Sequence, residues 1–276
     1  MKKIFWILLF SSCLVYAYEL KELLGFKNPR SIFANQEAVF VSNIGEKTNF
    51  LIKDKGGFIS KLSKNGDIID EKFIMGLDRP SSMLQIDYTL FVLDIDRLLA
   101  FDIRSTEQLF DLFINERSDL NRIVKLNDNT LLIGDNANSI LYKIDLQTRT
   151  YEEVLSLDTN KFGNMSDFTF IKNKIYIIAS NKDKNTLISV YDMSNKNIKL
   201  LKEEKANFNT IIAYENDVLL SDNSNGQLYR LNLSNKKGEA LKIDKLNAIT
   251  DMFLDNKILW LVQLEQQKVL KILLKN

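Results

Sequence analysis

The chain has 276 residues, of which 45% are hydrophobic, and its formal charge at pH 7 is +1. This length is ample for a sizeable core, and the near-balanced charge excludes a broad electrostatic attraction to nucleic acid or to an anionic membrane surface. The absence of histidine removes the commonest general base and transition-metal ligand, and the single cysteine allows neither an intrachain disulfide nor a cysteine-based zinc site.

The first seventeen residues predict a secretory signal peptide. Lys2 and Lys3 precede an apolar run over residues 4–10, and residues 15–17 (VYA) form a signal-peptidase site. The run is too short to span a bilayer. We therefore expect cleavage after Ala17, a domain over residues 18–276, no transmembrane span and a periplasmic or secreted location. The alternative is a lipoprotein, because residues 9–13 (LFSSC) loosely resemble a lipobox in which Cys13 would be lipidated.

Six similar units follow one another along the rest of the chain. Each unit contains a strongly apolar run, and these runs end at Asn43, Asp94, Asp135, Ala179, Asp222 and Gln263. The spacings between these ends are 51, 41, 44, 43 and 41 residues. Short runs separated by Asn, Asp and Gly turns, in units of about forty residues, are typical of propeller blades. The sequence therefore predicts an all-β fold, a six-bladed β-propeller.

The sixth unit ends after its third run, and its fourth strand is predicted at the other end of the chain. Residues 24–31 (LGFKNPRS) correspond position for position to residues 75–82 (MGLDRPSS), which follow a fourth strand. Residues 19–25 are therefore expected to form an outer strand. A ring closed in this way by an N-terminal strand has no open edge at its seam.

Several segments carry a family resemblance, namely residues 28–33 (NPRSIF), 39–45 (VFVSNIG), 53–83 and 131–145 (LLIGDNANSILYKID). They resemble the SMP-30/gluconolactonase-like and NHL-like six-bladed propellers, particularly secreted bacterial members. The resemblance extends over residues 19–276. It implies the fold much more strongly than an activity, because this fold serves hydrolases, binding modules and scaffolds alike.

In such propellers, the loops that lead into the innermost strands share one face with the ends of the second strands. Two columns of polar residues are expected there, around the mouth of the central channel. The first column is Arg30, Ser81, Asn121, Ser166, Asn209 and Thr250, and the second is Ser31, Ser82, Arg122, Asp167, Thr210 and Asp251. These residues either solvate the channel and cap strands, or form a shallow pocket for a small polar or anionic ligand. In the second case the guanidinium groups of Arg30 and Arg122 and the carboxylates of Asp167 and Asp251 would bind the ligand.

The resemblance also implies a divalent cation near the axis, held by a Glu, an Asn and an Asp. Arg30 stands where the Glu is expected, and its guanidinium would repel a cation. Asn209 stands where the Asp is expected, which leaves Asn121 or Asn164, Asp167 and Asp251 as weak candidates. We therefore expect no metal cofactor, with a calcium-like divalent cation as the alternative.

Two further features lie on the same face. Asp94, Asp135 and Asp222 end strands, and they are expected to form turns rather than calcium loops, although Asn136 and Asn138 are near. Residues 44–57 lengthen the first unit and are expected to overhang the mouth as a lid, a partner-binding tip or a tolerated insertion.

These observations predict an exported propeller that carries out no chemistry. It would bind a small polar ligand or an envelope protein at the channel mouth. The alternatives are a divalent-metal-dependent, lactonase-like hydrolase and an envelope scaffold protein. No motif for nucleotide binding, for a serine hydrolase or for nucleic-acid binding is present.

Overall fold

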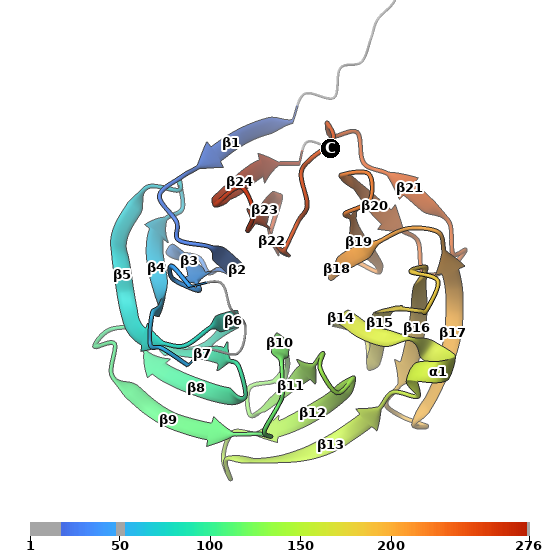
Figure 1. Cartoon of the computed structure of the whole chain (residues 1–276), viewed down its shortest axis with the longest axis horizontal. Helices are drawn as coiled ribbons and strands as arrows, with labels where there is room; N and C mark the ends of the chain where they lie inside the picture. The colour runs from blue at the N-terminus through green and yellow to red at the C-terminus, as the bar shows by residue number, and fades with distance from the viewer. Residues whose placement is uncertain (1–17, 48–52, 275–276) are drawn as a thin grey trace, which may run out of the picture.

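Six four-stranded antiparallel sheets stand around a central axis (Figure 1). The structure is a computed structural model that describes residues 18–47 and 53–274, so the predicted signal peptide lies outside the described residues. The helix α1 (Thr159–Phe162) interrupts the strands between the third and fourth sheets. This architecture confirms the predicted all-β, six-bladed propeller. Among the described residues, no helix has the length and apolar character needed to cross a membrane.

Each of the first five blades is one continuous stretch of chain, with its strands numbered from the axis outward. Blades 1 and 2 contain β2 (Pro29–Ala34), β3 (Ala38–Asn43), β4 (Gly57–Ser63), β5 (Ile68–Leu77), β6 (Pro80–Ile86), β7 (Thr89–Asp94), β8 (Arg97–Asp102) and β9 (Gln108–Phe113). Blades 3 and 4 contain β10 (Leu120–Asn127), β11 (Thr130–Asp135), β12 (Ile140–Asp145), β13 (Thr150–Ser156), β14 (Asn164–Ile171), β15 (Lys174–Ser180), β16 (Thr186–Asp192) and β17 (Asn197–Glu204). Blade 5 contains β18 (Phe208–Tyr214), β19 (Asp217–Asp222), β20 (Gln227–Leu231) and β21 (Gly238–Ala240).

Blade 6 combines the two ends of the chain. Its strands β22 (Asp251–Asp255), β23 (Ile258–Gln263) and β24 (Lys268–Leu273) are completed by β1 (Glu19–Leu23). β1 runs antiparallel to β24, with Glu19 opposite Leu273 and Leu23 opposite Val269. The predicted closure by an N-terminal strand is thus observed, although the strand ends two residues earlier than expected. Gly25 follows it with φ of 99°, a backbone conformation that favours glycine and turns the chain toward β2.

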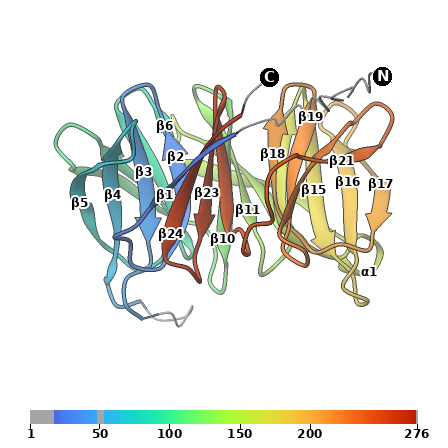
Figure 2. The ribbon, with the colours of Figure 1, turned by 90° about the horizontal axis from the view of Figure 1, so that it is seen from above.

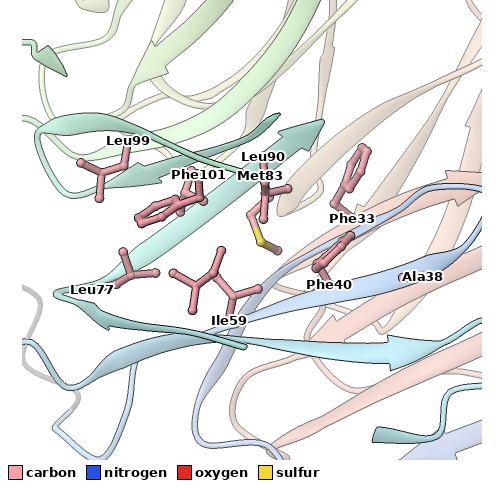
Figure 3. Close-up of a cluster of buried hydrophobic side chains, with 11 residues drawn as sticks. Phe33, Ala38, Phe40, Ile59, Leu77, Met83, Leu90, Leu99 and Phe101 are labelled. Atoms are coloured by element: carbon pink, nitrogen blue, oxygen red, sulfur yellow. The ribbon is translucent and has the colours of Figure 1, made fainter. Parts of the chain in front are cut away.

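The core is made by side chains that interlock between neighbouring blades. Between blades 1 and 2, Phe40 and Ile59 pack with Met83, Leu90 and Phe101, all of them buried (Figure 3). The apolar second strands are buried along most of their length because a blade packs on both of its faces. This explains why the second strand of each blade is the strongest apolar run in the sequence. Five of these strands end at the predicted residue, and β15 ends one residue later.

The loops into the inner strands and the ends of the second strands lie on one face of the ring, called the mouth face below. Backbone hydrogen bonds join these segments, for example from Ile44 N to Asn28 O (3.1 Å) and from Asn136 N to Asp119 O (3.0 Å). Figure 2 shows the ring from the side, with strands crossing its thickness and loops at both faces. The mouth face therefore brings together the residues of both predicted columns.

Candidate functional site

The aspartates that end second strands hold the loops of the mouth face. Asp94 accepts hydrogen bonds from the backbone N of Asp78 (2.8 Å) and of Arg79, and Asp135 accepts one from Asp119 N (3.0 Å). Asp222 accepts one from Asn207 N (3.1 Å) and one from Ser224 N (2.9 Å). These carboxylates organise backbone turns, which confirms the turn interpretation and assigns them a structural role.

A β-bulge brings both predicted columns toward the channel. In five blades the pairing of the inner strand with the second strand shifts at the first-column residue, for example between Pro80 and Ser82. In a regular strand, consecutive side chains point to opposite faces. A bulge adds one residue and redirects the side chains beside it. In these five blades, the bulge therefore accounts for two consecutive polar residues at the start of the apolar inner strand.

The second-column residues Arg122, Asp167 and Asp251 form a buried ion triad. Nη2 of Arg122 lies 2.6 Å from Oδ2 of Asp167, and Nη1 lies 2.9 Å from Oδ1 of Asp251. The side chain of Arg122 is 13% exposed, and those of the two aspartates are 1% and 7% exposed. The three residues begin the inner strands of blades 3, 4 and 6, so the triad joins blades around the axis (Figure 1).

Neighbouring groups also hydrogen-bond to the two carboxylates of this triad. Oδ2 of Asp251 accepts bonds from Ser31 Oγ (2.5 Å) and Ile32 N (3.1 Å), and Oδ2 of Asp167 accepts one from Ile211 N (2.9 Å). Burial by itself lowers the pKa of Arg122, but the charges of Asp167 and Asp251 raise it above its ordinary value. Arg122 is therefore permanently charged and neutralised from both sides.

This arrangement does not fit a divalent cation. A calcium-like ion needs several oxygen ligands with negative charge, whereas Asp167 and Asp251 face the guanidinium of Arg122. Asn164 is exposed and pairs through the backbone with Ser180 at the start of β14. Within residues 18–47 and 53–274, no cluster of three Asp, Glu, His or Cys side chains is placed to hold a metal.

Three of the remaining first-column residues, Asn121, Ser166 and Asn209, hydrogen-bond to another blade, and Thr250 bonds within blade 6. Asn121 Oδ1 accepts a hydrogen bond from Arg30 Nη2 (2.8 Å), and Asn209 Nδ2 donates to Ile249 O (2.9 Å). The backbone O of Ser166 accepts a bond from Asn136 Nδ2 (2.7 Å), and Thr250 Oγ1 accepts one from Leu264 N (3.2 Å). Most of the predicted polar ring is thus engaged in holding blades together.

A cavity of about 590 Å³ opens on the mouth face, beside the inner strands of blades 1, 2 and 3. Its volume falls in the range of small-molecule binding sites. Two of the predicted site residues, Arg30 and Ser81, line it, whereas Arg122, Asp167 and Asp251 do not. The other residues of the lining are Lys53, Arg79, Ile95, Asp96, Glu116, Arg117, Ser118, Asp119 and Ala137.

Arg79 is the most perturbed charged group of this cavity, and it is only 7% exposed. Burial and the nearby charge of Arg30 lower the pKa of Arg79 to about 10, against the opposing effects of Asp119 and Asp94. Arg79 therefore remains charged at pH 7 while standing close to a second cation. Four cations and three carboxylates line the cavity, which leaves an excess of one positive charge.

The described ends of the long loop between β3 and β4 reach the same cavity. Lys53 Nζ lies 2.6 Å from Oδ2 of Asp96, and Lys55 N donates to Oδ1 of Asp78 (2.9 Å). The loop thus crosses from blade 1 to blade 2 on the mouth face, as expected. Its apolar centre, residues 50–52, lies outside the described residues.

The two predicted columns did not include Arg79, Arg117, Asp96 or Asp119. Arg79 and Asp119 stand two residues before the first column, in the loop that leads into the strand. Three other units also have a polar residue at this position, namely Asn28, Asn164 and Asn207, whereas the sixth unit has Ala248. A third column, made of the residues two positions before the first column, would have predicted that Arg79 and Asp119 lie at the mouth face.

A second hollow, of about 320 Å³, lies at the edge of blade 5, where β21 has only three residues. Tyr18, Tyr214, Leu241 and Ile243 contribute to its lining. The phenol of Tyr18 donates a hydrogen bond to Asp244 (2.6 Å), which anchors the chain just before β1. Charged groups are sparser here than in the cavity of the mouth face.

The chain is similar in structure to several solved propellers. It matches the virginiamycin B lyase of Staphylococcus aureus with a TM-score of 0.64 at 16% identity, over 94% of this chain and 100% of the lyase chain. This chain and the lyase therefore share the propeller fold. A protein of unknown function from Bacteroides thetaiotaomicron matches with a TM-score of 0.67 at 11% identity, over 93% of this chain and 76% of that one. A chain of a nidogen/laminin complex matches at 0.61 and 14% identity, over 80% of each chain.

No protein-family model and no curated protein sequence matches the chain. At such low identities the structural similarities establish the fold alone. An activity has to be argued from the residues of the cavity and of the triad.

Proposed function

We propose that this chain is an exported, non-enzymatic propeller that binds a small anionic ligand in the cavity beside blades 1, 2 and 3. The observation that carries the proposal is the group of four cationic side chains around one cavity of about 590 Å³, namely Arg30, Lys53, Arg79 and Arg117. Guanidinium groups form paired, charge-assisted hydrogen bonds with carboxylates and phosphates. An anion would relieve the repulsion between Arg30 and Arg79 and balance the excess charge of the lining.

Several features favour binding over catalysis. The chain has no histidine, so it lacks the commonest general base. A histidine-to-alanine variant of the structurally similar virginiamycin B lyase is described as catalytically inactive, and this chain has no residue of that type. The carboxylates nearest the axis are paired with Arg122, which also disfavours a lactonase-like hydrolase that depends on a divalent cation.

Export and membership of the SMP-30/gluconolactonase-like superfamily belong to the same proposal. The signal peptide over residues 1–17 supports export to the periplasm or beyond. The six-bladed fold, together with the motif of residues 28–33, supports the superfamily. The cavity needs only residues of the domain that follows Ala17, so cleavage would leave it intact.

Calorimetric titration with small carboxylates and phosphates tests this function. We expect Arg30→Gln and Arg117→Gln each to weaken binding of an anion by about 10- to 100-fold, the effect of losing one charge-assisted hydrogen bond. Arg149→Gln is the matched control, because Arg149 is exposed in the turn between β12 and β13, far along the strands from the mouth face. The Arg149→Gln variant should bind the anion with the same affinity as the wild type.

Two results would contradict the proposal. The first is an affinity that the Arg30 and Arg117 variants leave unchanged. The second is an absence of binding for every anion tried, which, combined with co-purification of an envelope protein, would favour the scaffold function instead.

A further inference from the structure

Oγ of Ser118 and Oδ1 of Asp96 are buried polar atoms that have no hydrogen-bond partner among the described residues. Both residues line the cavity, and they are 6% and 5% exposed. Buried polar atoms are nearly always hydrogen-bonded, so each exception requires an explanation. A ligand bound in this cavity would supply the missing partners.

The Asp96 carboxylate is only half used by the protein. Its Oδ2 is paired with Lys53 Nζ at 2.6 Å, whereas its Oδ1 has only the Nε of Arg97 nearby, at 3.9 Å. That distance is too long for a hydrogen bond. Oδ1 is an acceptor that needs a donor, and the hydroxyl of Ser118 can either donate or accept.

The cavity lining therefore combines two kinds of recognition. Arg30, Arg79 and Arg117 offer donors to an anionic group, whereas Asp96 offers an acceptor and Ser118 a hydroxyl. The three carboxylates that line the cavity would repel a dianion, and the excess lining charge of +1 favours a ligand that carries one carboxylate. A simple anion such as chloride or pentanoate would leave Oδ1 of Asp96 unsatisfied.

We propose that the ligand is a small monocarboxylate that carries hydroxyl or amino groups. This inference rests on the proposed function and narrows it. The carboxylate pairs with the arginines, and a donor group elsewhere in the same molecule binds Oδ1 of Asp96 and Oγ of Ser118. Hydroxy acids and amino acids share this chemistry, and the experiment below separates them.

Three five-carbon acids test the inference by calorimetry with the purified exported protein. Pentanoate has no donor, xylonate has a hydroxyl on every carbon beyond the carboxylate, and 5-aminopentanoate has one ammonium. We expect xylonate or 5-aminopentanoate to bind at least about 10-fold more tightly than pentanoate, because a site with buried polar groups discriminates against ligands that leave them unpaired. Preference for xylonate identifies hydroxy acids, and preference for 5-aminopentanoate identifies amino acids.

Two variants assign that selectivity to the named atoms. Ser118→Ala removes the unpartnered hydroxyl with little change in volume, and Asp96→Asn removes the charge of the unpartnered acceptor. Each should reduce the preference for the donor-bearing acid over pentanoate by at least about 3-fold. Asp96→Asn should also strengthen the binding of pentanoate itself, because it removes a negative charge from the lining. Thermal melts of both variants report whether they fold, and the selectivity of the wild type alone decides the inference if they do not.

The outcomes separate this inference from the function on which it rests. If all three acids bind with equal affinity, the inference is overturned and the anion-binding function stands. If the preference exists but neither folded variant reduces it, the assignment to Asp96 and Ser118 is overturned. If none of the three acids binds while phosphate does, the ligand class is wrong, and if no anion binds, the proposed function fails as well.

Discussion

At the residue scale, three buried charges of this propeller are paired between blades. Arg122 of blade 3 contacts Asp167 of blade 4 and Asp251 of blade 6, and Ser31 of blade 1 donates to Asp251. Removing one partner from such a group leaves the others charged and unpaired in a buried site, which is strongly destabilising. The three residues of the triad therefore depend on one another, and the loss of any one of them should destabilise the closed ring.

Replacing Arg122 with methionine should lower the free energy of unfolding by about 3–5 kcal/mol, because two buried carboxylates then lack their counter-charge. Arg104→Met is the control, since the ion pair of Arg104 with Asp102 is exposed and its loss should leave the stability nearly unchanged. Chemical denaturation measures both. The triple variant Arg122→Met, Asp167→Asn, Asp251→Asn should recover part of the loss, and equal stability of Arg122→Met and Arg104→Met would contradict this role.

Asp94 should make the stability of the domain depend on pH. Burial raises the pKa of its carboxyl, against the opposing effect of the hydrogen bonds from Asp78 N and Arg79 N. The folded state then holds this proton more tightly than the unfolded chain does. The contribution of Asp94 is therefore fully present below the ordinary pKa of an aspartate and is lost as the pH rises through the raised value.

Unfolding curves measured at a series of pH values, for the wild type and for Asp94→Asn, isolate this contribution. The difference in unfolding free energy between the two proteins should favour the wild type more at acidic pH than at neutral pH. A difference that stays constant, or that grows as the pH rises, would show that the Asp94 pKa is not raised.

At the scale of elements, the seam of blade 6 depends on a single short strand. β1 contributes only Leu23 to the core of this region, where it packs with residues such as Trp260 and Val269. The rest of β1 is exposed on its outer side. The strand is therefore held by backbone pairing to β24, by one apolar anchor and by exposed ion pairs of Lys21 and Glu22.

Leu23→Ala should destabilise the domain by about 2–5 kcal/mol, the usual effect of truncating a fully buried leucine. Leu20→Ala, on the same strand, is the matched control because Leu20 is 36% exposed, and it should change stability by less than about 0.5 kcal/mol. Melting temperatures of both variants check this. Similar values for the two would show that β1 does not seal the ring.

Most of the fold could be predicted from the sequence, because each blade repeats the same strand order and the same apolar second strand. The match between residues 24–31 and 75–82 was enough to place β1. The contacts of the polar columns were not predictable in this way. A repeat aligns equivalent positions of different blades, but it does not indicate that the long side chain of Arg122 reaches two other blades. The same limit hid the cavity, whose lining comes from loop residues outside the two columns.

On the scale of the whole molecule, the ring has two distinct regions on its mouth face. Near the axis, the triad and the hydrogen bonds around it hold blades 3 to 6 and blade 1 together. Beside blades 1 to 3, the loops leave a cavity with an excess of positive charge. We infer that the first region maintains the ring and that the second region binds the ligand.

Export makes a separate prediction at this scale. If the signal peptide is cleaved after Ala17, the mature protein begins at Tyr18, whose side chain is anchored to Asp244. N-terminal sequencing of the exported protein should then give Tyr18 as the first residue. A blocked N-terminus together with a lipid-modified Cys13 would establish the lipoprotein alternative instead.

A crystal structure of the exported protein, grown with whichever of xylonate and 5-aminopentanoate binds more tightly, tests the central claim most directly. We predict that the carboxylate lies within about 3 Å of the guanidinium of Arg30 or Arg79, with a hydroxyl or ammonium group at hydrogen-bond distance from Asp96 or Ser118. The Arg122 triad should remain intact in that structure. A ligand bound only in the hollow beside Tyr18 and Tyr214, or an empty cavity at saturating ligand, would contradict the account.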